Sequence, residues 1–581
     1  MQYFSFLFCL IALSVSSQNV TKKYLSNETA TYEEAIAFYT EMGNKYSKAT
    51  LLSYGETDVG KPLHLFVISG DGDFDTKSVK QKNKRVIFIN NAIHPGEPCG
   101  VDASIKLTYD LLKNKKLKSL LDHVVICIVP VYNIGGALNR GCCSRANQNG
   151  PKEYGFRGNA QNLDLNRDFI KCDSKNAMTF TRMFRAWNPD IFIDTHTSNG
   201  ADYQYVMTLI ATQKDKLSPT LSQYMEEAML PPLYNTMKAV GYEMIPYVNS
   251  IDKFPDNGIY DFLETPRYSS GYTTLFNTIG FTTESHMFKP FEDRVLATYH
   301  FLLATIQFAN ENYEEIGEKR QLANRQVAEQ DVFAIYWELD TSQYKEIEFK
   351  GFEAGEKVSV ISGAQRLYYD REKPFTKTIR YYNTFKSTVE VHKPYMYLIP
   401  QAWKEVVERL ENNNIGMSRL AIDTVLEVET YYITNYESVK KPYESHYLHY
   451  NVQVNPQIQP VKYYKGDYVV ICNQSSNRYI VECLEPQAKD SYFAWNFFDA
   501  ALQQKEWFSS YVFEDLAAEL LEDNVALRAR FEAKKREDTD FAGNSRSQLR
   551  FIYENSSYYE KTHNLYPVAR LLKEIDIPLS D

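Results

Sequence analysis

Two side chains that could bind a metal ion follow an apolar run near residue 90. His94 and Glu97 belong to the segment His94-Pro-Gly-Glu97, which comes directly after the apolar residues 86–89. Imidazole and carboxylate groups are both good zinc ligands, and a spacing of three residues at the end of a strand lets both point at one ion. The pair is a weak indication by itself, and a third ligand is needed to make the case.

His196 is the candidate third ligand, and it ends the segment Ile191-Phe-Ile-Asp-Thr-His196. A single histidine at the end of a strand is more often structural than functional. In an α/β sheet, however, the carboxyl ends of parallel strands open onto one crevice, where such sheets bind ligands. The sequence therefore predicts a metal site that contains His94, Glu97 and His196.

Other polar residues stand where they could act on such a site. Asp164 and Asn166 alternate along one side of their segment, so Asp164 could accept a hydrogen bond from the second ring nitrogen of a ligand histidine. Glu284 ends another strand-like run, where a carboxylate suits a general base acting on a metal-activated water. Arg157 is a cation in a polar loop, a position that usually means a surface charge.

Alternating helices and strands are expected to position these residues. Apolar spacing predicts two sets of segments, namely helices over 32–46, 101–113, 174–187 and 294–313, and strands over 62–69, 85–90, 123–130 and 191–195. This alternation predicts an α/β fold with a mixed, mostly parallel sheet and helices on both faces. The metal site would lie at the carboxyl ends of its strands.

The character of the sequence changes after residue 324, beyond the charged run 314–320. Short strand-like stretches separated by turn residues then predominate, at 358–361, 379–382, 388–392, 431–434, 468–472 and 479–483. A predicted helix over 401–411 interrupts them, and the pattern from 497 to 535 is helical again. We therefore expect a β-rich or mixed C-terminal region after the α/β fold.

Composition and charge exclude several classes of protein. Hydrophobic residues make up 44% and charged residues 24%, which excludes a disordered or collagen-like chain. The formal net charge of −10 leaves no basic surplus for phosphates, so we expect no nucleic-acid partner. The sequence has no HExxH, GxSxG or Walker-type segment, which argues against zincin proteases, serine hydrolases and nucleotide hydrolases.

The N-terminus has the pattern of a secretory signal peptide. Residues 4–15 form a mostly apolar run followed by Ser16-Ser17-Gln18, and no later run supplies the roughly 20 apolar residues of a membrane span. We expect a secreted or periplasmic protein without a membrane span. Seven cysteines remain after the signal, and Cys472 and Cys483, on either side of a predicted hairpin turn, could form a cross-strand disulfide.

The order of the motifs resembles that of the zinc carboxypeptidases, the metallocarboxypeptidase family that includes carboxypeptidase A. The resemblance covers about residues 30–315, includes the approach Ser53–Leu63, and rests on five segments in the family's order: His94–Glu97, Phe156–Gly158, Leu163–Asp168, Asp194–His196 and Thr282–Glu284. Each segment is weak alone, but five in the right order are highly specific together.

The resemblance implies one zinc ion held by His94, Glu97 and His196. It implies that Arg157 polarises the scissile carbonyl and stabilises the oxyanion. It also implies that Glu284 acts first as the general base and then as the acid that protonates the leaving amine.

The resemblance also assigns residues to substrate binding. Asn166 and Arg167 would hold the C-terminal carboxylate of the substrate, and Asp164 would support the first ligand histidine. Tyr268 is the candidate for the family's substrate-capping tyrosine, although it lies only 16 residues before Glu284, and Tyr272 is the alternative.

We therefore expect a zinc-dependent metallocarboxypeptidase that hydrolyses the C-terminal peptide bond of peptides or proteins with a free C-terminus, using a zinc-activated water and a glutamate base. Two alternatives remain open: a cell-wall (peptidoglycan) peptide hydrolase on the same scaffold, and a zinc-binding, non-catalytic peptide receptor. The specificity pocket is expected between Tyr268 and Glu284, where residues 273–277 carry no charge, so a neutral or apolar C-terminal side chain is favoured.

Four parts follow from these changes along the chain. They are the signal peptide at 1–18, a zinc carboxypeptidase-like catalytic domain at 19–322, a β-rich accessory domain at 323–490, and a helical C-terminal segment at 491–581 that packs on the rest.

Overall fold

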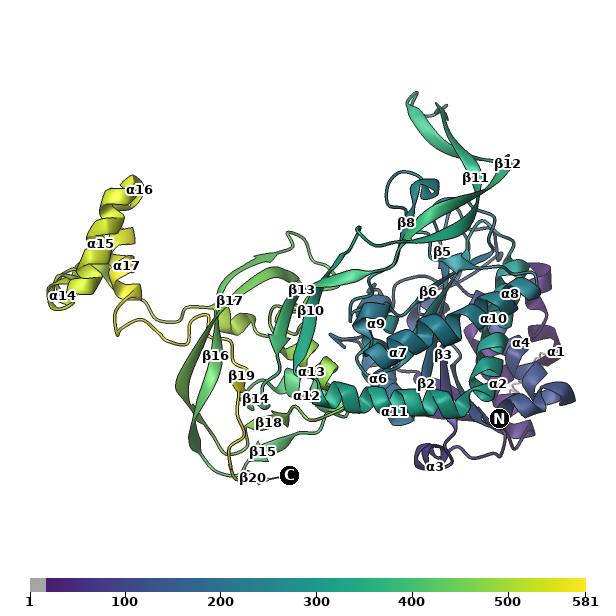
Figure 1. Cartoon of the computed structure of the whole chain (residues 1–581), viewed down its shortest axis with the longest axis horizontal. Helices are drawn as coiled ribbons and strands as arrows, with labels where there is room; N and C mark the ends of the chain where they lie inside the picture. Colours follow the sequence, from purple (N-terminus) through teal and green to yellow (C-terminus); the bar gives the residue numbers. More distant parts are fainter. Residues whose placement is uncertain (1–16, 581) are drawn as a thin grey trace, which may run out of the picture.

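An eight-stranded mixed sheet carries the residues predicted to form the site (Figure 1). The structure is a computed structural model that describes residues 17–580, so the predicted signal peptide lies outside the described residues apart from its last two positions. In order across the sheet, the strands are β1 (Ala49–Glu56), β2 (Pro62–Ser69), β4 (Val124–Val129), β3 (Arg85–Asn90), β5 (Ile191–Ser198), β9 (Ile279–His286), β6 (Met207–Ala211) and β7 (Ile245–Pro246).

Most neighbours in this sheet run parallel, including the four central strands β4, β3, β5 and β9. The pairs β1–β2, β2–β4 and β6–β9 are antiparallel. The predicted mixed, mostly parallel sheet is therefore confirmed, and the predicted strands match β2, β3, β4 and β5 closely.

Helices cover both faces of the sheet, as predicted. The helices of this part are α1 (Ser17–Val20), α2 (Tyr32–Lys45), α3 (Thr76–Gln81), α4 (Cys99–Lys113), α5 (Ile134–Leu138), α6 (Lys175–Trp187), α7 (Pro219–Gln223), α8 (Leu230–Ala239), α9 (Ser269–Thr274), α10 (Phe291–Glu311) and α11 (Tyr313–Glu329). Helix α2 begins where expected, because the Thr31 side chain accepts a hydrogen bond from the Glu34 N–H and the Glu34 carboxylate accepts one from the Thr31 N–H.

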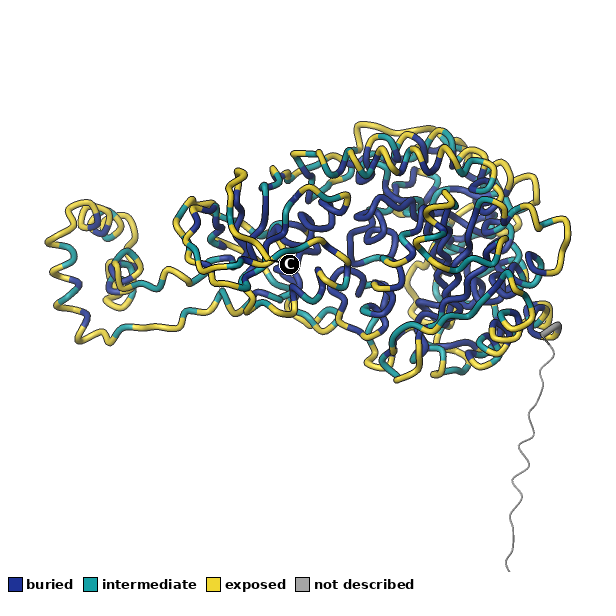
Figure 2. The backbone as a smooth tube through the Cα atoms, turned by 90° about the horizontal axis from the view of Figure 1, so that it is seen from below, coloured by how far each residue is buried: buried dark blue, intermediate teal, exposed yellow. Residues whose placement is uncertain are grey.

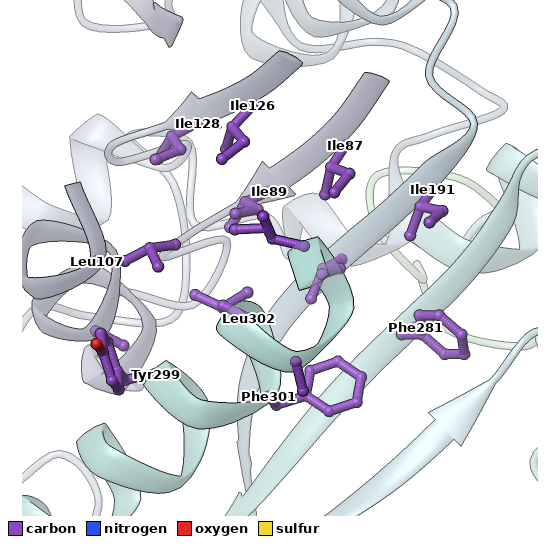
Figure 3. Packing of buried hydrophobic residues seen from close by; sticks show 14 of the residues in the cluster. Ile87, Ile89, Leu107, Ile126, Ile128, Ile191, Phe281, Tyr299, Phe301 and Leu302 are labelled. Carbon is purple, nitrogen blue, oxygen red and sulfur yellow. The ribbon is translucent and has the colours of Figure 1, made fainter. Parts of the chain in front are cut away.

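Alternate residues of the central strands face two separate apolar cores. Ile87 and Ile89 of β3 belong to one core, and Phe88 belongs to the other. Figure 3 shows Leu107 of α4 and Leu302 of α10 packed beside these isoleucines. Burial on both faces explains why the central strands have nearly continuous apolar sequences.

The second core is shared with the β-rich region. It contains Phe88 and Phe192 of the large sheet together with Tyr397, Tyr479 and Trp495 from beyond residue 324. The two regions are therefore joined by buried apolar contacts, and they lie side by side in Figure 1.

The β-rich region contains a seven-stranded antiparallel sheet and two long ribbons of strands. In order, the sheet contains β17 (His449–Tyr463), β16 (Thr424–Ser438), β19 (Ala569–Leu571), β14 (Met396–Ile399), β18 (Tyr468–Ile471), β15 (Ser418–Leu420) and β20 (Leu579–Ser580). The first ribbon pairs β10 (Val332–Leu339) with β13 (Phe385–His392). The second pairs β11 (Lys345–Val358) with β12 (Gln365–Tyr382), which also pairs with β8 (Ile259–Tyr260) from the α/β part. A β-rich second region is thus confirmed, and α12 (Lys404–Asn412) matches the helix predicted within it.

Two local predictions were wrong. Residues 479–483 are not a strand, because they lie in helix α13 (Asn477–Leu484), which is buried on all sides and whose apolar residues 479–481 resemble those of a buried strand. Residues 359–361 belong to the exposed turn between β11 and β12, and only Val358 of the predicted strand 358–361 lies in a strand. The charged run 314–320 lies in α11, where Arg320 forms a buried ion pair with Asp190.

The C-terminal helices differ from the expectation that this segment packs on the rest of the chain. Helices α14 (Ser510–Asp523), α15 (Val525–Glu537), α16 (Thr539–Ala542) and α17 (Ser545–Glu554) form a core of their own. Figure 1 shows this group projecting from the far end of the β-rich region, and Figure 2 shows that its backbone is largely exposed. Its buried apolar side chains face one another, whereas Tyr511, Val512 and Val525 are exposed.

The cysteine prediction was also wrong. Cys142 and Cys143, adjacent in sequence, form the disulfide, whereas Cys472 and Cys483 are buried free thiols. Helix α13 carries Cys483, so the two thiols do not face each other across a hairpin. No helix within residues 17–580 combines the length and the apolar character needed to cross a membrane.

Candidate metal and substrate site

The carboxyl ends of three adjacent parallel strands bring the predicted site together. His94 lies in the loop after β3, and His196 lies near the end of β5, the neighbouring strand. Glu284 of β9 is the register partner of His196. Partners on adjacent parallel strands point to the same face of a sheet, so residues far apart in sequence meet at one edge.

His94, Glu97 and His196 form a buried group of possible metal ligands. One ligand atom from each lies within 4.8 Å of the others, and each residue is only 3% exposed. Nδ1 of His94 is buried without a hydrogen-bond partner and lies 3.3 Å from a Glu97 oxygen, and Nδ1 of His196 lies 3.2 Å from the other oxygen. The donor types and the unpartnered nitrogen both fit a divalent ion such as zinc.

Two carboxylates fix the orientation of the ligand histidines. Asp164 lies 2.9 Å from Nε2 of His94, and Asp194 lies 2.9 Å from Nε2 of His196. This leaves both Nδ1 atoms directed at Glu97, the arrangement in which an outer carboxylate orients a metal-binding histidine. The contact between Asp164 and the second ring nitrogen of His94 is the one that the sequence analysis expected. Asp194 was missed, although its spacing of two residues from His196 in a strand puts both side chains on one face.

Arg145 is a further residue that the sequence analysis missed. Its guanidinium donates to Oε1 of Glu97 at 2.7 Å and to the Thr197 carbonyl at 2.9 Å. Burial alone would raise the pKa of Glu97, but Arg145 and the two histidines outweigh burial and hold this pKa well below its usual value. Glu97 is therefore ionised, as a metal ligand must be. The sequence of the polar loop 133–162 does not indicate that Arg145 and Arg157 both reach Glu97.

Glu284 faces a cleft of about 580 Å³ that the metal group also lines. Burial raises the pKa of its carboxyl to about 7, with His196 and other cations opposing the rise. A carboxyl whose pKa lies near neutrality can both take up and release a proton. It is thus suited to acid–base work beside a metal.

Arg157, Asn166 and Arg167 line the same cleft. Arg157 donates to Asp164 at 3.0 Å and to Glu97 at 3.4 Å, so it is held beside the metal group. The Asn166 amide oxygen accepts the Ser269 N–H at 3.1 Å. The three residues give one wall of the cleft two guanidinium groups and an amide, which are groups that bind carbonyl and carboxylate oxygens.

The structure distinguishes the two candidate tyrosines. Tyr268 lines the cleft, and the Arg167 guanidinium lies over its ring at 4.4 Å. Tyr272 is fully buried, and its hydroxyl donates to Asn413 at 2.7 Å, away from the cleft.

The expectation for the specificity pocket was wrong in part. Residues 273–277 are buried in the core around α9 and do not line the cleft, because the helical turn there faces the second apolar core. Of the segment between Tyr268 and Glu284, Thr282 does line it. Glu264, which precedes the predicted segment, also lines the cleft and was missed.

The β-rich region reaches the site through two loops. The hydroxyl of Tyr443 accepts a hydrogen bond from Nε of Arg167 at 3.1 Å. The Glu444 carboxylate accepts one from the Asp164 N–H at 2.8 Å. In addition, Asp490 binds both the N–H and the side chain of Arg267, directly before Tyr268. None of these contacts could be seen in sequence, because they join residues more than 200 positions apart.

Comparison with known proteins agrees with this geometry. The profile of the zinc carboxypeptidase family matches residues 35–274, a range that contains all three possible metal ligands. Residues 35–274 therefore form a zinc carboxypeptidase domain. The protein is a metallocarboxypeptidase enzyme, and this domain implies a peptide or protein substrate. Glu284 lies ten residues beyond the matched range.

The relatives of this metallocarboxypeptidase include fungal proteins of similar length. It is 22% identical to carboxypeptidase 2 of Trichophyton equinum over 482 residues, covering 80% of each chain. It is also 22% identical to carboxypeptidase 2 of Trichophyton tonsurans over 485 residues, again covering 80% of each. Among solved structures, a putative carboxypeptidase A from Shewanella denitrificans matches 49% of this chain and 69% of its own, with 18% identity and a TM-score of 0.38.

Proposed function

We propose that this enzyme removes the C-terminal residue of peptides by zinc-dependent hydrolysis. The observation that carries the proposal is the buried His94–Glu97–His196 group, which shares one cleft with Glu284 and with the arginines Arg157 and Arg167. Each of these groups has a proposed role in hydrolysis at a free C-terminus.

His94, Glu97 and His196 are the residues that would hold the zinc ion. Both histidines would bind through Nδ1, because a carboxylate occupies the Nε2 side of each ring. A zinc ion bound there supplies a Lewis acid and makes water acidic enough to ionise near neutral pH.

Glu284 is the proposed proton carrier. As a carboxylate it takes a proton from the attacking water, and as a carboxylic acid it donates that proton to the nitrogen of the departing residue. The raised pKa of about 7 makes both steps accessible near neutral pH. Burial in the cleft is the cause of this raised pKa, so the protein environment itself prepares the group.

The arginines are the proposed oxygen-binding groups. Arg157 is beside the metal group, where it would stabilise the negative charge that develops on the scissile carbonyl oxygen. Arg167 and Asn166 would bind the substrate's terminal carboxylate, for which a planar guanidinium is well matched. Tyr268 would cover the bound residue, since its ring already lies against Arg167.

We also propose that residues 19–322 are the catalytic unit and 323–490 an accessory unit that supports it. The hydrogen bond from Arg167 to Tyr443 favours this relation, because it links the proposed carboxylate site to the β-rich region. The apolar run at residues 4–15 supports export from the cytoplasm to a secreted or periplasmic location.

A pair of matched peptides tests the proposed function. The zinc-loaded enzyme should release the last residue from a peptide with a free C-terminus, and the same peptide with an amidated C-terminus should react at least about tenfold more slowly because Arg167 then has no carboxylate to bind. Equal cleavage of both peptides would contradict exopeptidase action. Release only from a γ-linked or D-residue wall fragment would favour the cell-wall alternative instead.

A further inference from the structure

Glu264 is an acidic residue of the cleft that the proposed reaction does not use. It is 4% exposed and lines the same cleft as the metal group, Arg167 and Glu284. Its Oε2 atom is buried and has no hydrogen-bond partner. A buried carboxylate without a partner is costly unless a ligand or a proton satisfies it.

No cation of the described chain neutralises this carboxylate. Within residues 17–580, no lysine, arginine or histidine nitrogen forms an ion pair with Glu264. The nearby buried Lys216 donates instead to the main-chain carbonyl of Glu264, at 2.7 Å. Burial and the neighbouring Asp261 raise the pKa of Glu264 well above its usual value, which fits an acid that lacks its counter-ion.

Apolar side chains line the cleft together with Glu264 and Arg167. The Arg167 guanidinium lies over Tyr268, and the Tyr268 ring packs edge-to-face on Phe262 at 5.3 Å. Phe262 is two residues before Glu264, and Ile210 also lines this cleft. A cleft that offers aromatic and aliphatic side chains as well as a buried acid suits a long apolar stem that carries a terminal cation.

We propose that Glu264 binds the cationic side chain of a C-terminal lysine or arginine, while Arg167 holds the carboxylate of the same residue. This inference rests on the proposed function and names its substrate class. It replaces the expectation of a neutral or apolar preference, which was drawn from residues 273–277 that do not line the cleft. The bound cation supplies the partner that the Glu264 carboxylate lacks.

The first test compares peptides that differ only in their last residue. The zinc-loaded parent enzyme is given peptides that end in lysine, arginine, norleucine or glutamate, where norleucine keeps the lysine stem without its charge. We expect kcat/KM for lysine and arginine to exceed that for norleucine by at least about tenfold, as for a buried charge-assisted contact. Equal or better cleavage of the norleucine peptide would overturn the proposal without any variant being made.

Variants at the same position then test the residue itself. Glu264→Gln should reduce kcat/KM for lysine at least about tenfold more than for norleucine. Glu264→Lys should shift the preference toward a C-terminal glutamate. The matched control is Asp256→Asn, which removes an acid eight residues away that pairs with Lys377 and does not line the cleft, and it should leave the lysine-to-norleucine ratio unchanged.

The outcomes separate this inference from the proposed function. Release of norleucine with no effect of Glu264→Gln on the ratio, in a variant that keeps its zinc and its circular dichroism spectrum, would refute the role of Glu264 and leave the carboxypeptidase reaction standing. No release from any of the four peptides by the parent enzyme would refute the proposed function itself.

Discussion

Individual residues of the site act through the partners that hold them. His94 can direct Nδ1 at a metal only because Asp164 occupies its Nε2 side, and the same holds for His196 and Asp194. The sequence predicted the ligands and Asp164, because these residue types recur at strand ends in a recognisable order. It could not predict Arg145, whose contact with Glu97 depends on how a long polar loop folds back.

Replacement of Asp164 with asparagine tests the support of His94. An asparagine can present its amide nitrogen to Nε2 and no longer fixes the ring tautomer, so zinc affinity should fall about 10- to 100-fold. Competition with a chelator, followed by measurement of bound zinc, gives this affinity directly. The matched control is Asp71→Asn, an acid of the β2–α3 connection that pairs with Lys84 and touches no ligand. Unchanged zinc affinity in Asp164→Asn would contradict the account.

Single elements connect distant parts of this chain to the site. Loop residue Tyr443 accepts a hydrogen bond from Arg167, and Asp490 fixes the segment before Tyr268. In the proposed function, the β-rich region would therefore support substrate binding without supplying a group that reacts. Hydrophobic periodicity predicted most helices and strands near the metal, but such periodicity says nothing about which loop of a second region will cover them.

Tyr443→Phe tests this contribution. Loss of the hydroxyl should loosen Arg167 and raise KM roughly fivefold for a peptide with a free C-terminus, with kcat nearly unchanged, since a typical hydrogen bond contributes about 1 kcal/mol. The control is Tyr447→Phe in the same loop, whose side chain is 53% exposed. A fall in kcat with no change in KM would show that Tyr443 acts in some other way.

Helix α4 carries a buried acid that makes stability depend on pH. Asp102 is 1% exposed and accepts hydrogen bonds from the Thr29 hydroxyl and the Ala30 N–H. Burial raises the pKa of Asp102 from 3.8 to about 7. Between these two pH values the folded state therefore keeps the proton of this carboxyl, whereas the unfolded state has lost it. Its contribution to stability is therefore lost as pH rises from about 4 to 7, by at most about 4 kcal/mol.

Asp102→Asn should remove the loss of stability that the buried Asp102 carboxyl causes as pH rises. The Tm of the variant relative to that of the parent should increase steadily as pH is raised from 5 to 8, which thermal unfolding at several pH values can measure. A difference in Tm that is independent of pH would mean that Asp102 is ionised in the folded protein throughout.

At the scale of the whole molecule, the chain consists of one large body and one small helical group. The α/β and β-rich regions share the second apolar core, whereas helices α14–α17 share theirs with no other element. The two chain segments that lead to this group meet, since the Lys505 N–H donates to Glu560. The amphipathic patterns of the helices were visible in the sequence, but their docking partner was not, because apolar faces can pack on each other as well as on a larger body.

Removal of the helical group tests this independence. Replacement of residues 507–558 by a short Gly/Ser linker should leave kcat/KM within about twofold and the main unfolding transition within a few degrees, because no core residue of the body is exposed. Scanning calorimetry and a peptide release assay check both. A large fall in the Tm of the body would show that the group supports the larger core after all.

In the proposed reaction, Glu284 works beside a zinc ion held by His94, Glu97 and His196. The most direct measurement pairs zinc content with release of C-terminal residues, for the parent enzyme and for Glu284→Gln. We predict one equivalent of zinc in both proteins and release by the parent alone, with the variant slowed by at least about a hundredfold, the lower range for loss of a general base. Full activity in Glu284→Gln, or a parent enzyme that binds no zinc, would contradict the account.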